Sequence, residues 1–255
     1  MSLLETFNLV KTFGERTVVK GVSFSVGDSE IVGLLGRNGA GKTTSFRMVI
    51  GMIDADRGTV RFAGRDVTKL PMYQRARLGM GYLSQEPSIF TRLSVRQNLM
   101  AILETRRISR KQQKARCEHL LAQFGLENVA ESQARTCSGG ERRKLEIARA
   151  LVTEPKLILL DEPFSGVDPL AVEDLQNEIK RLTTMGIAVL ITDHNVHQTL
   201  RVCERAYIIN EGKVLREGTP KELINDEAVR RSYLGSMFRG DEFDESTPRV
   251  AEEVE

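Results

Sequence analysis

The chain has 255 residues, of which 40% are hydrophobic and 28% are charged, and its formal net charge is +2. This length can bury one substantial core, or one core with a smaller attached subdomain. The near balance of charges gives no whole-chain attraction to nucleic acid or membrane. No apolar run approaches the roughly 18 residues of a membrane-spanning helix, and the first residues lack the pattern of a signal peptide. Cys117, Cys137 and Cys203 have no metal-ligand spacing, so we expect reduced thiols in a cytoplasmic protein.

Alternating hydrophobicity between residues 3 and 26, with a turn near Gly14, predicts short antiparallel strands. Phe13 precedes this turn. Its ring could stack on a nucleotide base or pack against neighbouring strands, and spacing alone favours packing. Further edge strands are expected at residues 59–62 and 66–67.

A glycine-rich loop, G-R-N-G-A-G-K-T-T at residues 36–44, lies between a predicted buried strand and a predicted helix. Its glycines let backbone N–H groups curl around phosphate oxygens. Lys42 can reach the β- and γ-phosphates, and the hydroxyl of Thr43 can ligate Mg²⁺. The pattern therefore predicts a nucleoside triphosphate site, with these binding residues: Arg37, Asn38, Gly39, Ala40, Gly41, Lys42, Thr43 and Thr44.

Residues 80–87 are predicted to run from a short strand into a loop that contains Gln85. An amide there could ligate Mg²⁺ or orient a water molecule without adding charge. The following region, to about residue 151, is predicted to be helical, with capping-box spacing at Ser94 and again at Ser109.

A basic cluster lies within this helical region and allows either a nucleic-acid surface or a solvated helix face. The absence of interleaved aromatics, together with flanking Glu104 and Glu118, favours the solvated face. The cluster consists of Arg106, Arg107, Arg110, Lys111, Lys114 and Arg116.

Ser138 and Glu141 form a third capping-box pattern, around Gly139 and Gly140. Without side chains to block close approach, this helix start could bind a second phosphate. One chain would then carry two half-sites for the same anion, which makes sense if two copies face each other.

Two further apolar segments, residues 157–160 and 187–192, predict buried parallel strands that end in polar residues. Asp161 could hold Mg²⁺ and Glu162 could orient or deprotonate water, since ligands bind at this edge of open α/β sheets. His194 follows the second strand and can reach a γ-phosphate. A metal pair of His194 with His197 lacks a third ligand.

Near the C-terminus, strands at residues 205–210 and 213–217 are predicted to form a hairpin, and a helix is predicted from Lys221. Residues 241–255 hold seven acids and one Arg, which predicts a disordered tail.

Together these motifs resemble the ATP-binding cassette (ABC) family over about residues 4–235. The loop at 36–44 is similar to the Walker A motif, Gln85 to the Q-loop, residues 138–141 to the signature, residues 157–162 to Walker B, residues 165–168 to the D-loop and His194 to the H-loop. Phe13, Cys137 and Glu141 depart from the commonest family pattern, where Tyr, Leu and Gln are usual.

The resemblance implies an α/β fold: an ABC-type P-loop NTPase core, with a mixed sheet, flanking helices and an antiparallel β subdomain, plus a helical signature subdomain. The core is expected at residues 1–85 and 156–217, the helical subdomain at 86–155 and a C-terminal helical extension at 218–240.

The resemblance also implies an ATPase that binds ATP and Mg²⁺ and works as a homodimer. Metal ligands would be Thr43, Gln85 and Asp161; catalytic residues would be Glu162, His194 and Gln85; the base would stack on Phe13. Ser138, Gly139, Gly140 and Asp168 would reach the nucleotide held by the other copy. Transmembrane subunits would dock near Gln85, Phe90 and Arg92 and hold the chain at the cytoplasmic face of the inner membrane, with no role for nucleic acid.

Within the family, sequence segments such as E-P-S-I-F-T-R-L-S-V-R-Q-N at residues 86–98 and I-T-D-H-N-V at 191–196 resemble the matching segments of ATPases of lipopolysaccharide export. ATPases of branched-chain amino-acid importers share much of this sequence and remain an alternative. A soluble ABC ATPase of DNA repair or translation, or a nucleotide switch without turnover, is a further possibility.

Overall fold

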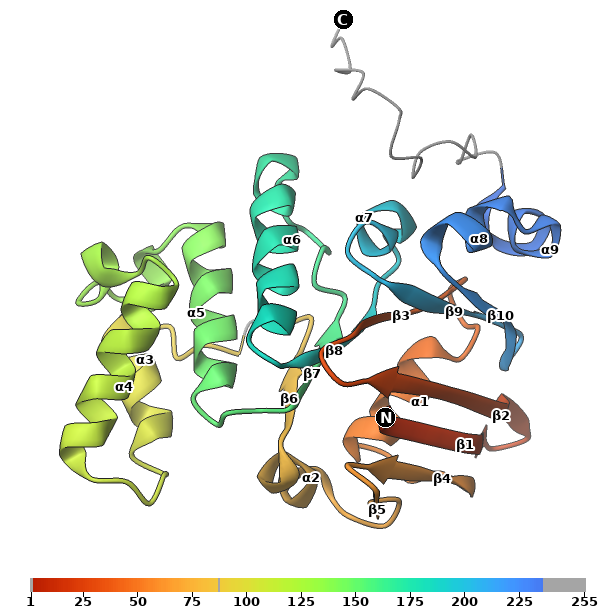
Figure 1. The fold of residues 1–255 in the computed structure, drawn as a ribbon, viewed down its shortest axis with the longest axis horizontal. Helices are drawn as coiled ribbons and strands as arrows, with labels where there is room; N and C mark the ends of the chain where they lie inside the picture. The colour runs from red at the N-terminus through yellow and green to blue at the C-terminus, as the bar shows by residue number, and fades with distance from the viewer. Residues whose placement is uncertain (1, 87, 236–255) are drawn as a thin grey trace, which may run out of the picture.

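The computed structural model describes residues 2–86 and 88–235 and contains two sheets (Figure 1). The larger sheet has the strand order β10-β9-β3-β8-β7-β6 and is parallel except for β10, which pairs antiparallel with β9. This is the mixed sheet expected from the sequence. Its strands are β3 (Ile31–Gly36), β6 (Met80–Leu83), β7 (Leu157–Asp161), β8 (Ala188–Thr192), β9 (Arg205–Asn210) and β10 (Lys213–Gly218).

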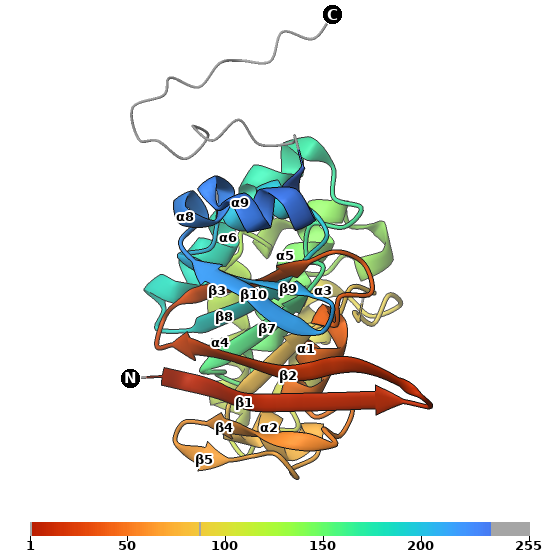
Figure 2. The same cartoon turned by 90° about the vertical axis from the view of Figure 1, so that its right-hand side faces the viewer.

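The second sheet is antiparallel, in the order β2-β1-β4-β5, and forms a separate layer in Figure 2. Its strands are β1 (Ser2–Phe13), β2 (Arg16–Gly27), β4 (Arg57–Phe62) and β5 (Arg65–Asp66). The predicted antiparallel pairing is confirmed. The first two strands are longer than expected, because bulges, one near Asn8 at φ 47°, let pairing continue through shifts of register.

Helix α1 (Lys42–Ile50) packs between the two sheets. Its Phe46, Val49 and Ile50 share a core with residues of β1 and β2 and with Leu157 and Leu159 of β7. Ile158 and Leu160, which alternate with them, contribute to a second core on the opposite face. The strand is buried on both faces, which explains its continuous hydrophobic run.

That second core joins the sheet to α6 (Pro169–Thr184) and to a group of helices at one side of the sheet (Figure 1). This group lies within the range expected for the helical subdomain and comprises α3 (Val95–Leu103), α4 (Arg110–Gln123) and α5 (Gly139–Leu151), with short turns at Glu127–Val129 and Ala134–Thr136. The capping boxes of Ser94, Ser109 and Ser138 are all confirmed.

The remaining helices are α2 (Met72–Leu78), α7 (Val196–Leu200), α8 (Pro220–Asn225), α9 (Glu227–Val229) and a π-helical turn (Arg230–Leu234). Among the described residues, no helix combines the length and apolar character needed to cross a bilayer. The acidic tail and residues 236–240 of the C-terminal extension lie outside the described residues, and the division into subdomains stays a prediction.

Candidate functional site

The phosphate loop links the end of β3 to the start of α1, and close backbone packing requires glycine at two of its positions, Gly36 and Gly41. A Cβ at Gly36 would lie 2.1 Å from the carbonyl oxygen of Ile209, and one at Gly41 would lie 2.9 Å from that of Val18. Ala40 closes a turn onto Arg37, with an N···O distance of 3.1 Å. The Gly212 N–H, in the β9–β10 turn, donates to the Ala40 carbonyl at 2.9 Å and supports the loop from behind.

Lys42, the first residue of α1, is 7% exposed. Its ammonium donates to the carbonyl oxygens of Gly36 at 2.6 Å and Arg37 at 3.1 Å. Burial lowers the pKa of Lys42, and the carboxylates of Glu162 and Asp193 act in the opposite direction. The ammonium of Lys42 therefore lies close enough to Glu162 and Asp193, which follow β7 and β8, for their charges to act on it.

The three predicted catalytic side chains meet at one carboxylate oxygen. Gln85 donates from Nε2 to Oε2 of Glu162 at 3.0 Å, and Nδ1 of His194 lies 3.2 Å from the same oxygen. Gln85 Nε2 also contacts Oγ of Ser165 at 3.4 Å. Glu162 is thus held from two sides.

The backbone at Glu162 adopts φ 48°, which is uncommon for a residue with a side chain. Its N–H donates to the Thr192 carbonyl at 2.7 Å, so the residue after β7 is tied to the end of β8. Such strain costs about 1–3 kcal/mol and persists only where surrounding structure holds it. The bend turns the chain at the carboxyl edge of the sheet, where the predicted catalytic side chains lie.

Two buried aspartates flank the cluster. Asp161 ends β7, and burial raises its pKa, while a hydrogen bond from the Tyr82 hydroxyl, at 3.2 Å, lowers it. Asp193, which the sequence did not single out, is completely buried and accepts the N–H groups of Phe164 and Asn195, each at 2.8 Å. Burial also raises the pKa of Asp193. Its position at the end of β8, directly before His194, was the available sequence signal.

The predicted second phosphate-binding end lies at the start of α5. Ser138 Oγ accepts the Glu141 N–H at 3.2 Å, and the Glu141 carboxylate accepts the Ser138 N–H at 2.7 Å. Gly139 and Gly140 are exposed, and a Cβ at either would meet no atom of this chain within 4 Å. Nothing inside the chain therefore requires glycine at these two positions.

A cleft of about 570 Å³ has the start of α5 on one side and the residues after β7 on the other. Its lining includes the predicted site residues Gln85, Ser138, Gly139, Gly140, Glu162 and Asp168. Lys42, Thr43 and Asp161 are not part of it. The fold therefore brings the predicted signature residues together with Gln85 and Glu162 at one cleft, and His194 and the phosphate loop do not line it.

These motifs, in this order on this fold, agree with a family match. The sequence model of the ABC transporter family matches residues 19–165. The chain belongs to the ABC transporter family. It is 51% identical over 240 residues to the lipopolysaccharide export system ATP-binding protein LptB of Haemophilus influenzae and 52% identical over 240 residues to LptB of Escherichia coli; each alignment covers 94% of this chain and 100% of the relative.

Solved structures agree. MJ1267, an ATP-binding cassette of an ABC transporter in its ADP conformation, matches with a TM-score of 0.83 and 30% identity over 92% of this chain and 99% of that chain. The cbiO1 subunit from Clostridium perfringens, part of the ABC transporter complex cbiONQ, matches with a TM-score of 0.82 and 25% identity over 94% of this chain and 97% of that chain. The expected ABC fold and the assignment as a nucleotide-binding ATPase are confirmed.

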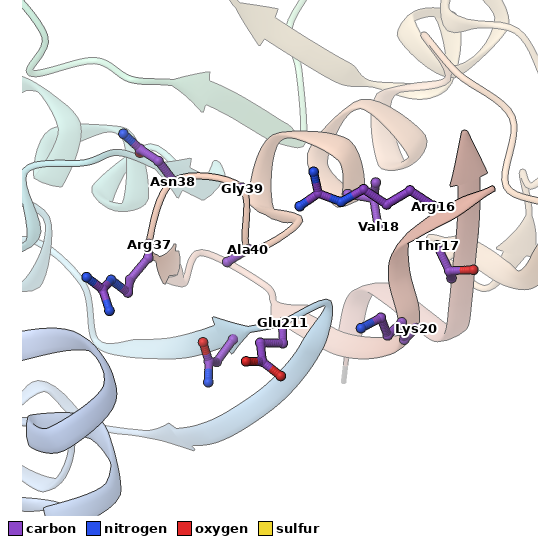
Figure 3. Close-up of a pocket in the computed structure, with 10 residues that line it drawn as sticks. Arg16, Thr17, Val18, Lys20, Arg37, Asn38, Gly39, Ala40 and Glu211 are labelled. Atoms are coloured by element: carbon purple, nitrogen blue, oxygen red, sulfur yellow. The ribbon is translucent and has the colours of Figure 1, made fainter. Parts of the chain in front are cut away.

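In this ABC ATPase, residues 37–40 of the phosphate loop line a pocket of about 500 Å³ (Figure 3). Figure 3 shows Arg16 of β2 and Glu211 beside the loop from Arg37 to Ala40. The lining residues that the sequence did not predict are Arg16, Thr17, Val18, Lys20, Asn210 and Glu211. They come from β2 and the β9–β10 turn, which only the tertiary fold brings to the loop.

Phe13 is 50% exposed, and the Lys11 ammonium lies 5.5 Å from the centre of its ring. Half of the surface of Phe13 is thus open to solvent at the end of β1, and the choice between stacking on a base and packing on neighbouring strands stays a prediction. This exposure leaves the ring accessible to a planar ligand.

The side chains expected to hold Mg²⁺ present a hydroxyl (Thr43), a carboxylate (Asp161) and an amide oxygen (Gln85). Oxygen donors of these kinds suit a hard divalent cation. Because Gln85 uses its nitrogen for Glu162, its Oε1 stays available as an acceptor. The unfavourable burial of the Asp161 carboxylate would be offset by a neighbouring cation. The donor set therefore fits this ion.

Proposed function

We propose that this chain is the ATP-hydrolysing subunit of a transporter that exports lipopolysaccharide from the inner membrane. The observation that carries this proposal is the match to LptB proteins at 51% and 52% identity over the full length of each relative. The alternative of a branched-chain amino-acid importer and that of a soluble ABC ATPase have no comparable support.

Hydrolysis would follow from the cluster at the carboxyl edge of the large sheet. Glu162, fixed by Gln85 and His194, is placed to orient or deprotonate the attacking water. Lys42 and the backbone of the loop would hold the β- and γ-phosphates. Bound Mg²⁺ would neutralise charge on the phosphate oxygens. Thr43, Asp161 and Gln85 would hold that ion, and positioning would supply most of the catalysis.

A second copy of the chain would complete each site. The open approach to Gly139 and Gly140 supports this step, because an atom from outside the chain can come close to their backbone N–H groups. Ser138, Gly139, Gly140 and Asp168 of one copy would thus contact the ATP held by the loop of the other, with the base on Phe13. ATP binding would then close a homodimer.

Transmembrane subunits would dock on the segment that follows Gln85. Phe90 is 47% exposed, and the Arg149 guanidinium of the signature helix lies 5.1 Å from the centre of its ring. Arg149 also donates to Oγ of Ser88 at 2.8 Å. Arg149 lies on α5, the helix that begins after Ser138. Movement of α5 would therefore be transmitted through Arg149 to this segment and to a partner bound near Phe90 and Arg92. These partners would hold the chain at the cytoplasmic face of the inner membrane.

The deciding experiment is purification of the tagged chain from detergent-solubilised membranes, followed by identification of its partners and measurement of ATP hydrolysis with added lipopolysaccharide. We expect co-purifying membrane subunits whose complex responds to lipopolysaccharide, and retention of lipopolysaccharide in the inner membrane when the chain is depleted. Co-purification with an amino-acid permease would overturn the substrate assignment and leave the ATPase assignment intact.

A further inference from the structure

The turn between α3 and α4 carries a group of exposed cations that the catalytic machinery does not use. We call this group the basic patch; its members are Arg106, Arg107, Arg110, Lys111 and Lys114, and all five are exposed. In the part of the chain that the structure describes, none of them forms an ion pair or a side-chain hydrogen bond. Residues 104–116 hold six Lys and Arg against one Glu, although the whole chain carries only +2.

Several other surface cations are paired with acids. Arg96, on the neighbouring helix α3, forms ion pairs with both Glu118 and Glu131, and Arg216 pairs with Asp226. The first turn of α4 instead begins with Arg110 and Lys111 and contains no acid. Cations at this end oppose the helix dipole, so local helix stability does not explain them.

An apolar side chain lies within the patch. Ile108 is 38% exposed and stands between Arg107 and Arg110 in the sequence. An apolar residue flanked by cations suits an interface where phosphates lie above hydrocarbon. Nucleic acid fits less well, because residues 104–116 include no aromatic side chain on which a base could stack.

The basic patch and Phe90 lie at opposite ends of α3. Phe90 is tied to the start of α3, since its N–H donates to the Asn98 side chain at 2.8 Å and its carbonyl accepts from the same amide at 3.0 Å. The patch lies at the other end of this nine-residue helix, which is about 13 Å long. In Figure 1 the α3–α4 turn lies at the lower left, away from α8 and α9.

We infer that the basic patch binds the anionic lipid headgroups of the membrane surface, with Ile108 entering the interface. This location rests on the proposed function, because a membrane subunit seated on Phe90 would bring the patch beside the bilayer. Each cation near an anionic surface strengthens binding about fivefold. The patch would therefore strengthen the attachment that the transmembrane partners provide.

Flotation of the purified full-length chain with vesicles tests this inference. We expect it to bind vesicles of phosphatidylcholine mixed with phosphatidylglycerol at low salt, and not vesicles of phosphatidylcholine alone. The variant Arg107→Gln, Arg110→Gln, Lys111→Gln should lose about a hundredfold in affinity. The matched control Lys180→Gln, Arg201→Gln, Lys213→Gln removes the same charge from other exposed positions and should change affinity less than twofold.

Insertion of the turn can be measured separately because the chain contains no tryptophan. Fluorescence of Ile108→Trp should shift to shorter wavelength when anionic vesicles are added. Met185→Trp, at a position that is also 38% exposed, should not shift. Equal loss of binding in both charge variants, binding without lipid preference, or tighter binding to RNA than to vesicles would overturn the inference. The assay needs no membrane partner, so its failure would leave the proposed function intact.

Discussion

Nδ1 of His194 lies 3.2 Å from Oε2 of Glu162, across 32 positions of the chain. The contact joins the residue that follows β7 to one that follows β8, neighbouring parallel strands whose carboxyl ends share one edge of the sheet. Gln85 reaches the same oxygen from the end of β6, on the other side of β7. Residues at the ends of three adjacent strands thus fix the carboxylate that we propose activates the attacking water.

Replacing Glu162 with Gln removes a basic carboxylate and keeps the side-chain size. Hydrolysis should fall about 10²- to 10⁴-fold, the usual contribution of a general base. ATP affinity should stay within a few-fold, and a stable ATP-bound dimer should appear in size-exclusion chromatography. Glu173→Gln on the exposed surface of α6 is the control and should behave as the unchanged chain. If the Glu162 variant released phosphate at the rate of the unchanged chain, Glu162 would not be the general base.

Gly139→Ala and Gly140→Ala separate stability from dimer function. Neither added methyl meets an atom of the chain within 4 Å, and alanine favours a helix over glycine by about 0.5–1 kcal/mol. Thermal unfolding should therefore occur at an equal or higher temperature. ATP-dependent dimerisation and hydrolysis should both drop, because the methyl blocks close approach by the nucleotide of the other copy. Full activity in both variants would contradict the two-copy site.

Asp161→Asn should stabilise the fold while impairing hydrolysis. Burial raises the pKa of Asp161, so the folded chain binds this proton more tightly than the unfolded chain does. That stabilisation is present at acid pH and is lost as pH rises from the ordinary aspartate pKa through the raised one. At neutral pH the buried charge is then unfavourable. The variant should therefore raise Tm at neutral pH, because it removes this buried charge.

The pH profile supplies the check on that prediction. The difference in Tm between Asp161→Asn and the unchanged chain should shrink as pH falls below the raised pKa of Asp161. Asp174→Asn, on the exposed surface of α6, is the control variant for the same measurement. A lower Tm for Asp161→Asn at neutral pH would mean that its carboxylate is a net stabilising group.

Arg75 is 1% exposed and serves as a buried cap for α1. Its guanidinium donates to the carbonyl oxygens of Met48 at 2.7 Å and Val49 at 2.6 Å, at the C-terminal end of the helix that begins with Lys42. Arg75→Met should lower the unfolding free energy by about 3 kcal/mol or more, because several buried carbonyls lose their donor. Chemical denaturation measures this loss. Arg77→Met, on the exposed side of α2, should change stability by less than about 0.5 kcal/mol.

The sequence by itself determined the features that depend on a few neighbouring residues. The loop before Lys42, the capping boxes of Ser109 and Ser138 and the apolar runs of β7 and β8 were all predicted. Glycine torsions and caps act over about four residues, and continuous burial of a strand is recorded directly in its hydrophobic run. The family match followed from these same local motifs.

Only the tertiary structure decided which distant residues share a site. Strand order placed Gln85, Glu162 and His194 at one oxygen, and the β9–β10 turn brought Glu211 beside the phosphate loop. The tertiary structure also buries Arg75 of α2 at the end of α1, although Arg77, the other charged residue of α2, is exposed. These outcomes depend on which sheet edges and helix ends meet in space. The residue pattern of a single segment cannot predict these contacts, because they join segments separated by dozens of residues.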